Sequence, residues 1–401
     1  MTDREESKPE EPKAFLHIVH VSDMHVRDGS SPTDLAAERK VQAWVARLQL
    51  IAPAKANFVR RLWEEGLAGH DPDAHDQFCD FAESFASDPR FRGVETWLLD
   101  TGDLTTMGDD GSLDAATGWL AEFKKLLKAK ELFLLYGNHD AWPEKFPFGA
   151  SAGEIRRHRE RMRGGKFAAS WPQGPLSADI PNASSKLLLY GVNSAIDDRE
   201  LNSLALGEVE RDPSWETGDT GTDQMVRLAH AVEKGFHDDG KTRDFRILAV
   251  HHPVHYPDRP KLWMHMRNDQ AVADALIGFD ARGRGKLAHL VLSGHTHTTF
   301  PALGALPGAA GGTTYWPLSK GQIQLIAGSL TQMPLDEDRG KQPADQYVPQ
   351  QCQILSFLSE PKSASRKLRV ERRIAGRIGD QWGFLTPDGS SRDFESFSIE
   401  F

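Results

Sequence analysis

The side chains that could do chemistry stand directly after apolar, strand-like segments of the sequence. Five such segments end in residues that bind metal ions, namely Asp23 with His25, Asp103, Asn138, His251, and His295 with His297. Seven oxygen and nitrogen ligands without sulfur are typical of two borderline first-row metal ions, rather than of calcium or an iron–sulfur centre. If the two ions lie about 3.5 to 4 Å apart, one carboxylate has to bridge them, and Asp103 is the natural candidate.

The elements that must position these residues are the strands of an α/β sheet. Apolar and β-branched runs predict strands over residues 14–22, 97–99, 131–136, 245–250 and 287–292. In open α/β sheets, ligands bind at the carboxyl ends of strands, which is where the metal-binding residues stand. Gly102 and Gly294 permit the sharp turns with which two of these strands end.

Residues 26–95 separate the first two strands and predict a helical insertion. Phe78, Phe81 and Phe85 fall at helical spacing there and are assigned to packing. The Asp-rich stretch GHDPDAHD contains His70 and His75, which invites a metal-binding interpretation. A solvated loop and helix cap are favoured for this stretch.

A basic run predicts that residues 141–186 form a cap insertion over the site. Arg156, Arg159 and Arg163 lie at helical three- and four-residue spacing and would share a face. Guanidinium groups match phosphate oxygens, so these arginines are predicted to contact the non-reacting part of an anionic substrate. A solvated helix face is the alternative interpretation.

Length and composition limit the class of protein. The chain has 401 residues, enough for one large α/β domain with insertions or for two domains. Its 48 Lys and Arg residues against 58 Asp and Glu residues give no general attraction to nucleic acid or to an anionic membrane. The two cysteines, Cys79 and Cys352, are too few for a disulfide framework or a cysteine-based zinc site.

The two ends of the sequence differ in character. The charged, proline-containing stretch MTDREESKPEEPK predicts a disordered tail over residues 1–13. Strand-like pieces and a turn signal predict a β-rich extension over residues 336–401. No apolar run is long enough to cross a bilayer, so we expect a cytoplasmic protein without a membrane partner. The oligomeric state is left open.

The ordered motifs DMH, GD, GNHD, HHP and GHTH resemble those of the calcineurin-like metallophosphoesterase family. The resemblance runs from about His17 to about Leu330, and no member of the motif set is missing. It implies an α/β (α+β) fold, a four-layer αββα sandwich of two mixed β-sheets flanked by helices. The phosphoesterase domain would span residues 14–335 and contain the helical insertion, and the β-rich C-terminal addition would follow it.

The resemblance also implies roles for the site residues. One metal ion would be held by Asp23, His25, Asp103 and His297, and the other by Asp103, Asn138, His251 and His295. The two ions would be divalent or trivalent manganese, iron or zinc. His139 would bond the phosphate or protonate the leaving oxygen, and Asp140 is placed to bond the His139 imidazole and fix its tautomer. His252 is assigned to substrate contact rather than to a metal ion.

The implied activity is hydrolysis of a small phosphate ester by in-line attack of a hydroxide that bridges the two metal ions. The HHP and GHTH motifs and residues 191–194 are closest in style to the bacterial class III phosphodiesterases, which include cyclic-nucleotide and glycerophosphodiester enzymes. A diester is therefore favoured over a monoester.

Two alternatives stay open. A nuclease is supported by the basic runs at residues 156–166 and 366–377 and is opposed by the acidic total, so nucleic acid is not the favoured partner. A non-catalytic interaction module on the same fold would be indicated if one or more of the metal ligands were missing or substituted.

Overall fold

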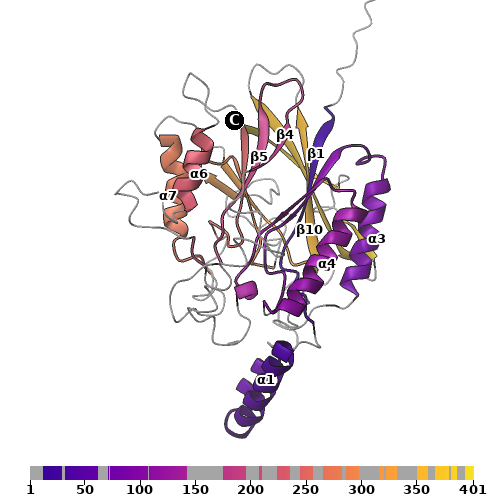
Figure 1. Ribbon diagram of the computed structural model, residues 1–401, viewed down its shortest axis with the longest axis vertical. Helices are drawn as coiled ribbons and strands as arrows, with labels where there is room; N and C mark the ends of the chain where they lie inside the picture. The colour runs from indigo at the N-terminus through magenta and orange to yellow at the C-terminus, as the bar shows by residue number, and fades with distance from the viewer. Residues whose placement is uncertain are drawn as a thin grey trace, which may run out of the picture.

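The structure is a computed structural model in which two β-sheets pack face to face (Figure 1). It describes residues 12–28, 32–61, 71, 73–106, 108–141, 175–195, 207–209, 224–234, 244–255, 265–281, 286–297, 316–319, 322–331, 350–359, 366–378, 381–385 and 393–401.

The first sheet combines the N-terminal strands with the C-terminal ones. Its parallel part comprises β1 (Ala14–Val21), β2 (Glu95–Asp100) and β3 (Glu131–Leu134). Its antiparallel part comprises β10 (Gln351–Ser359), β11 (Lys367–Ile378), β12 (Gln381–Phe384) and β13 (Glu395–Glu400). The strand order is β12-β11-β10-β1-β2-β3, and β13 pairs with β11.

The C-terminal strands are hydrogen-bonded directly to the first strand of the chain. β10 pairs with β1 in antiparallel register, with Ile18 opposite Leu355. The β-rich character expected after residue 336 is therefore present, and these strands continue the sheet that begins with β1. A domain boundary at residue 336 stays a prediction.

The second sheet is parallel at its centre. It comprises β4 (Leu176–Asp179), β5 (Lys186–Gly191), β6 (Phe245–Ala249), β7 (Leu290–Ser293), β8 (Trp316–Ser319) and β9 (Gln322–Ile326). The order is β4-β5-β6-β7-β9-β8, and β5, β6, β7 and β9 run parallel. Every residue of β6 and β7 is buried, as expected for parallel strands that are covered on both faces.

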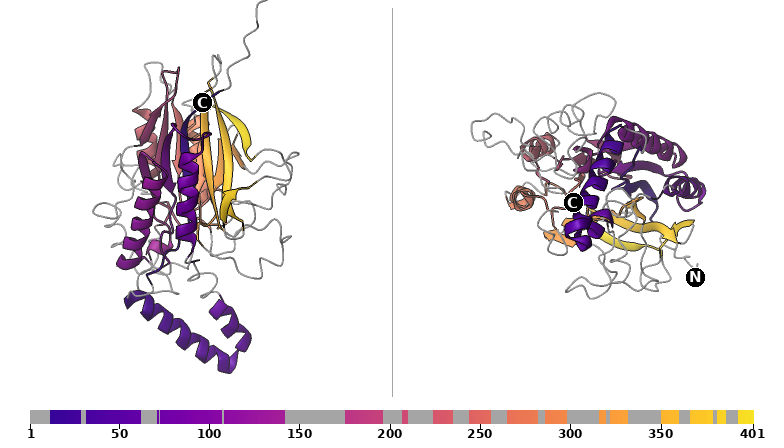
Figure 2. Two further views of the ribbon diagram at one scale, coloured as in Figure 1. Left: turned by 90° about the vertical axis from the view of Figure 1, so that its right-hand side faces the viewer. Right: turned by 90° about the horizontal axis from the view of Figure 1, so that it is seen from below.

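Helices cover the outer face of each sheet, so the molecule has four layers (Figure 2). α3 (Ala74–Ser87) and α4 (Asp110–Leu126) lie on the first sheet, and α6 (Gln224–Glu233) and α7 (Asp269–Ala281) lie on the second. Between the sheets, the rings of Phe245 and Phe357 lie 6.1 Å apart. The predicted sandwich of two mixed sheets flanked by helices is confirmed.

The predicted helical insertion has two differently packed parts. α3 buries Phe78, Phe81 and Phe85, as expected, and the ring of Phe78 lies 5.2 Å from that of Trp382 in β12. In contrast, α1 (Pro32–Ile51) and α2 (Pro53–Arg61) form a hairpin that projects beyond one end of the sandwich (Figures 1 and 2).

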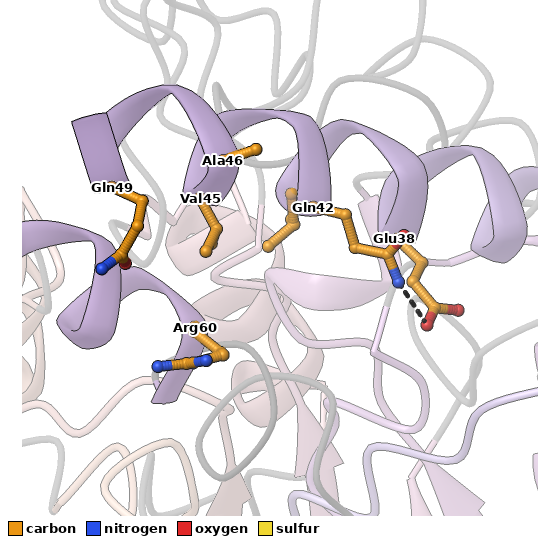
Figure 3. A pocket seen from close by; sticks show the side chains of 7 residues that line it. Glu38, Gln42, Val45, Ala46, Gln49 and Arg60 are labelled. Atoms are coloured by element: carbon orange, nitrogen blue, oxygen red, sulfur yellow. Dashed lines mark hydrogen bonds between the residues drawn. The ribbon is translucent and has the colours of Figure 1, made fainter. Parts of the chain in front are cut away.

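The hairpin exposes much of its apolar surface. Leu50 is 86% and Ile51 81% exposed. A hollow of about 350 Å³ lies between the two helices (Figure 3). It is lined by Glu38, Val41, Gln42, Val45, Ala46, Gln49 and Arg60, and therefore by none of the motif residues.

Buried His17 on β1 makes stability depend on pH. Its Nδ1 lies 2.9 Å from Ser356 Oγ. Burial, and then the charge of Arg373, lower the pKa of His17 from 6.5 to about 4. The unfolded chain therefore takes up a proton below pH 6.5 that the folded chain does not bind until about pH 4. The contribution of neutral His17 to the unfolding free energy is therefore fully present above pH 6.5 and is lost as the pH falls from 6.5 to about 4.

We expect His17→Gln to remove that loss. Between pH 7.5 and pH 5, urea unfolding of the wild type should show a fall in unfolding free energy that exceeds the fall in the variant by about 2 kcal/mol. The comparison uses only the change in unfolding free energy with pH, so a variant that is less stable by the same amount at every pH does not affect it. Parallel slopes in the two proteins would show that His17 titrates normally in the fold.

Candidate metal centre

The predicted ligands meet at one edge of the sandwich. β1, β2 and β3 are parallel neighbours, as are β6 and β7, so in each sheet their carboxyl ends share an edge. The loops that follow are joined by backbone hydrogen bonds, such as that from Asp23 N to Gly102 O at 2.9 Å. Leu330 N donates to Ser22 O at 3.1 Å and ties the end of the second sheet to the end of the first.

Five of the predicted ligands have a backbone conformation that residues with a side chain rarely adopt. The φ angle is 53° at Asp23, 46° at His25, 55° at Asp103, 70° at His295 and 57° at His297. Among the described residues other than glycine, only Lys128 and Asn182 share a positive φ. Such conformations cost free energy and cluster at functional sites, because the surrounding fold has to hold them.

Glycines allow the loops to approach one another closely. Gly102 has a φ of 111°, and a Cβ at this position would lie 2.5 Å from Gly137 N and 2.7 Å from the carbonyl carbon of Tyr136. The backbones of the turns after β2 and β3 therefore lie in direct contact at this point. This contact brings the residue after each glycine, Asp103 and Asn138, to the same place.

The first predicted ligand set is assembled as a compact group. Asp23, His25, Asp103 and His297 each offer one ligand atom, and these atoms all lie within 4.8 Å of one another. Asp23 Oδ1 lies 3.3 Å from His297 Nε2, and His25 Nε2 lies 3.1 Å from His297 Nε2. The first three residues are almost completely buried, and the His297 side chain is 32% exposed.

The second predicted set adjoins the first through Asp103. His251 Nε2 lies 3.2 Å from Asp103 Oδ2 and 3.1 Å from Asn138 Oδ1. His251 Nδ1 donates to Thr101 O at 2.9 Å, which turns Nε2 toward the group. The ring of His295 lies 5.1 Å from that of His251. Both histidines are buried, and the two predicted sets adjoin through Asp103 and His251.

The carboxylate oxygens fit a bound cation. Asp23 Oδ2 accepts from His295 N and Asp103 Oδ1 accepts from His139 N, each at 2.8 Å. The other oxygens, Asp23 Oδ1 and Asp103 Oδ2, are buried and accept no hydrogen bond from the described residues. Neighbouring ligands on one ion lie about 3.0 to 3.4 Å apart at bond lengths near 2.1 Å. Four separations within the two sets, of 3.1 to 3.3 Å, agree with this range, whereas His25 Nε2 lies 3.9 Å from Asp23 Oδ1.

The protonation states also favour cation binding. Burial raises the pKa of Asp23, but the nearby His297 outweighs burial and lowers it to about 2. Burial likewise acts against ionisation of Asp103, but His251 and His139 hold its pKa well below the usual value. Burial lowers the pKa of His295 to about 3. The group therefore offers ionised carboxylates and a neutral imidazole near neutral pH.

His251 differs from the other buried histidines. Burial lowers its pKa, but the Asp103 carboxylate beside it outweighs burial and raises the pKa to about 9. Without a metal ion, a positively charged His251, with a second proton on its imidazole, is therefore favoured beside the Asp103 carboxylate. A bound cation would take the place of that proton, which is the behaviour expected of a metal ligand.

His139 and Asp140 lie at the centre, with partners that the sequence did not indicate. His139 Nδ1 donates to Thr106 O at 3.0 Å. The Asp140 carboxylate accepts instead from Gly137 N, Leu104 N, Thr105 N and Thr105 Oγ1, at 2.8 to 3.3 Å. The expected bond from Asp140 to the imidazole is thus replaced, because a backbone carbonyl already fixes the tautomer. Asp140 instead joins the loops after β2 and β3.

His252 is buried against the second ligand set. Its ring lies 4.2 Å from that of His295, and its Nδ1 lies 2.8 Å from Ser194 Oγ. His252 also forms a three-residue group with His251 and His295 whose ligand atoms lie within 4.8 Å. The substrate contact expected of His252 stays a prediction.

Several positioning residues carried no separate signal in the sequence. Ser329 Oγ donates to Asp23 O at 2.7 Å, and Thr331 Oγ1 donates to Met24 O. Thr106 Oγ1 donates to His25 O at 2.9 Å. The serine and threonines bind backbone carbonyls of the DMH turn, and only their position after strand ends could have drawn attention to them.

Some predicted residues lie outside the described part of the chain. Arg156, Arg159 and Arg163 belong to residues 142–174, as does most of the predicted cap, and most of the predicted N-terminal tail is also outside. Their substrate contacts stay predictions. Within the described residues, no helix is both long and apolar enough to span a bilayer.

Comparison with known proteins agrees with this site. Residues 16–299 match the family described as calcineurin-like phosphoesterase. The match covers more than half of the chain, and the chain therefore belongs to the calcineurin-like phosphoesterase family. Membership supports metal-dependent hydrolysis of phosphate esters, and the motif resemblance noted in the sequence is confirmed. No curated protein matches the chain.

Two solved structures are similar at low identity. The calcineurin-like phosphoesterase YfkN from Bacillus subtilis is 13% identical with a TM-score of 0.31, covering 97% of this chain and 91% of that one. A candidate 5'-nucleotidase from Staphylococcus aureus, in complex with alpha-ketoglutarate, is 9% identical with a TM-score of 0.36. That alignment covers 96% of this chain and 54% of the other, so the chain spans about half the length of that protein.

Proposed function

We propose that the chain hydrolyses a phosphodiester with the help of two metal ions held at the strand ends. One ion would be held by Asp23, His25, Asp103 and His297, and the other by Asp103, Asn138, His251 and His295. The observation that carries this proposal is the pair of buried inner oxygens, Asp23 Oδ1 and Asp103 Oδ2, each within 3.3 Å of a histidine Nε2 and accepting no hydrogen bond from the described residues.

The position of each residue in the site indicates its role in the reaction. When bound, the two ions supply Lewis acidity that withdraws charge from the phosphate and makes hydroxide available near neutral pH. Thr106 O fixes the His139 proton at Nδ1, so this imidazole can bind the phosphate or move a proton only through Nε2. Asp140 keeps the loop that carries Asn138 and His139 against the loop that carries Asp103.

The preference for a diester rests on the amino-acid sequence of the motifs. The HHP and GHTH motifs and residues 191–194 resemble the bacterial class III phosphodiesterases more than the other branches of the family. Ser194, from that segment, binds the backbone N of His252 at 3.0 Å and its Nδ1 at 2.8 Å. The segment that carries the resemblance thus positions a histidine beside the second ligand set.

No observation on the described residues favours a nuclease. Of the basic run at residues 366–377, Arg372 is buried, donates to Gln353 Oε1 at 2.7 Å and pairs with Glu395 at 3.6 Å. Arg373 is paired with Glu371 and Asp393 at 3.4 and 3.5 Å. These arginines neutralise carboxylates inside the fold, so they do not form the exposed basic surface that nucleic acid requires.

A hydrolysis panel tests the proposal. Chelator-treated protein should be inactive, and added Mn²⁺ should restore activity, because charge stabilisation and hydroxide both depend on the ions. Among a monoester, a linear diester, a cyclic nucleotide and single-stranded DNA, a small diester should have the highest kcat/KM. Activity that survives complete metal removal would refute the metal-dependent mechanism, and a preference for the monoester would refute the substrate assignment.

A further inference from the structure

A second group of metal-binding side chains lies on the outer helices, away from the strand ends. His75 and Cys79 are one helical turn apart on α3 and so share a face. Glu122 on α4 approaches the same face. Cys79 Sγ lies 3.7 Å and Glu122 Oε2 lies 3.2 Å from His75 Nε2, and the three ligand atoms lie within 4.8 Å of one another.

The imidazole of His75 is held in the orientation that a metal ligand needs. Its Nδ1 lies 2.8 Å from Asp76 Oδ1, which fixes the proton on Nδ1 and turns the lone pair of Nε2 toward Cys79 and Glu122. The ring also packs against Trp119 at 4.6 Å and Phe123 at 5.6 Å on α4. A carboxylate behind a histidine is the usual support of a zinc-binding imidazole.

The two separations measured from His75 Nε2 match those around a tetrahedral ion. With Zn–S near 2.3 Å, Zn–N near 2.05 Å and Zn–O near 2.0 Å, a tetrahedral angle gives separations of about 3.6 Å between nitrogen and sulfur and about 3.3 Å between nitrogen and oxygen. The observed separations are 3.7 and 3.2 Å. The Glu122 side chain is 52% exposed, so an ion can enter and water can occupy the fourth position.

We propose that His75 Nε2, the Cys79 thiolate and the Glu122 carboxylate bind one Zn²⁺ ion, separate from the strand-end centre. Thiolate, imidazole and carboxylate together suit zinc among the common divalent ions. Binding forms the Zn–S bond and releases the Cys79 proton to solvent, without any oxidation or reduction. This site departs from the expectation, drawn from the count of two cysteines, that the chain has no cysteine-based zinc site, because it takes one cysteine only.

Two other functions of this group fit less well. Burial, and then Glu122 and neighbouring carboxylates, raise the pKa of Cys79 to about 12, so the thiol without metal is a poor nucleophile. A simple ion pair between His75 and Glu122 leaves no function for the sulfur. The packing of the imidazole against two aromatic rings, stacked on Phe123 and tilted against Trp119, also holds it in place, which a solvent-exposed pair does not require.

Cobalt absorption is the direct test. Co²⁺ adopts the same tetrahedral geometry as Zn²⁺, and a thiolate bonded to it adds an intense charge-transfer absorption in the near ultraviolet. The strand-end ligands are oxygens and nitrogens only, so this absorption reports on sulfur alone. We expect metal-free, full-length protein titrated with Co²⁺ to develop it, and one equivalent of Zn²⁺ to bleach it.

Matched variants identify which cysteine supplies the sulfur ligand. Cys79→Ser, which keeps the size of the side chain, should abolish the absorption and lower zinc content by one ion per chain, and Glu122→Gln should weaken binding at least about tenfold. Cys352→Ser should change neither, because Cys352 is a buried thiol with no place in the group. Phosphoesterase activity with Mn²⁺ should be unchanged in Cys79→Ser.

The outcomes separate this site from the proposed catalytic centre. The proposal of a zinc site at His75, Cys79 and Glu122 (the outer site) would be overturned by either of two results. One is no cobalt–thiolate absorption in the wild type, and the other is unchanged absorption and zinc content in Cys79→Ser. Neither result depends on whether the strand ends hydrolyse a diester. Conversely, inactive protein that still shows the absorption would count against the proposed function and leave the outer site standing.

Discussion

Asp103→Asn is expected to lower turnover of a phosphate ester at least about 10³-fold and to reduce bound metal at the strand ends from two ions to one or none. The carboxylate contacts both ligand sets: its Oδ2 lies 3.2 Å from His251 Nε2, and one of its oxygens lies within 4.8 Å of the ligand atoms of Asp23, His25 and His297. An amide lacks the negative charge that both ions require. Loss of several kcal/mol of charge stabilisation, at about 1.36 kcal/mol per tenfold, gives the stated scale.

Asp100→Asn is the matched control for this change. Asp100 is also a fully buried carboxyl at the end of β2, and its Oδ1 accepts from Gly102 N at 2.7 Å. Burial raises its pKa well above the usual value and so favours the neutral acid, which an amide resembles in shape and charge. We expect two bound ions and activity within about threefold of the wild type, which is about 0.7 kcal/mol.

Elemental analysis and steady-state kinetics check both variants. The change at Asp103 should lower metal content and kcat together, whereas the change at Asp100 should leave both near the wild-type values. If Asp103→Asn still holds two ions and turns over normally, Asp103 does not bridge them. If both variants lose metal equally, general disruption of the β2 turn is the cause rather than a missing ligand.

His139→Ala is expected to lower kcat by roughly 10²- to 10⁴-fold while metal occupancy stays near that of the wild type. His139 is not among the predicted metal ligands, and Thr106 O leaves only Nε2 available to the substrate. In the protein without metal ions, burial lowers the pKa of His139. An anionic substrate bound nearby would act in the opposite direction, because it stabilises the imidazolium.

The leaving group distinguishes proton donation from positioning. A nitrophenolate leaves without a proton, whereas an alkoxide requires one, so the loss in His139→Ala should be much smaller for the nitrophenyl ester. Added imidazole should restore part of the alkyl ester activity by filling the space left by the side chain. Equal losses for the two esters would assign His139 to binding the phosphate. A loss of metal would assign it to the support of Asp103, whose Oδ1 accepts from His139 N.

The ligand residues could be predicted because each motif is local. The DMH, GD and GHTH turns follow directly after apolar strands, and parallel strands bring their carboxyl ends to one edge whatever lies between them. This argument needs only the strand pattern and the residue that follows it. It also explains why the two-sheet sandwich, which came from the motif resemblance, could not be derived from periodicity alone.

Partners within the site could not be predicted, because they depend on which atoms meet across loops. The sequence neighbour of His139 is Asp140, yet the imidazole binds Thr106 O, and Asp140 holds the backbone of Leu104 and Thr105. A carboxylate next to a histidine has the right chemistry for the expected bond. The close contact between the turns at Gly102 and Gly137 decides otherwise, since it presents several backbone N–H groups to Asp140.

By itself the sequence determined the family, the seven candidate ligands and their order, because strand ends and the residues that follow them are encoded within a few positions. Features that depend on contacts between distant segments were decided only by the tertiary structure. It placed the C-terminal strand β10 against β1, and it brought Glu122 of α4 to His75 and Cys79 of α3. Helical spacing can place two ligands on one face, but the third comes from another helix, and only packing sets its distance.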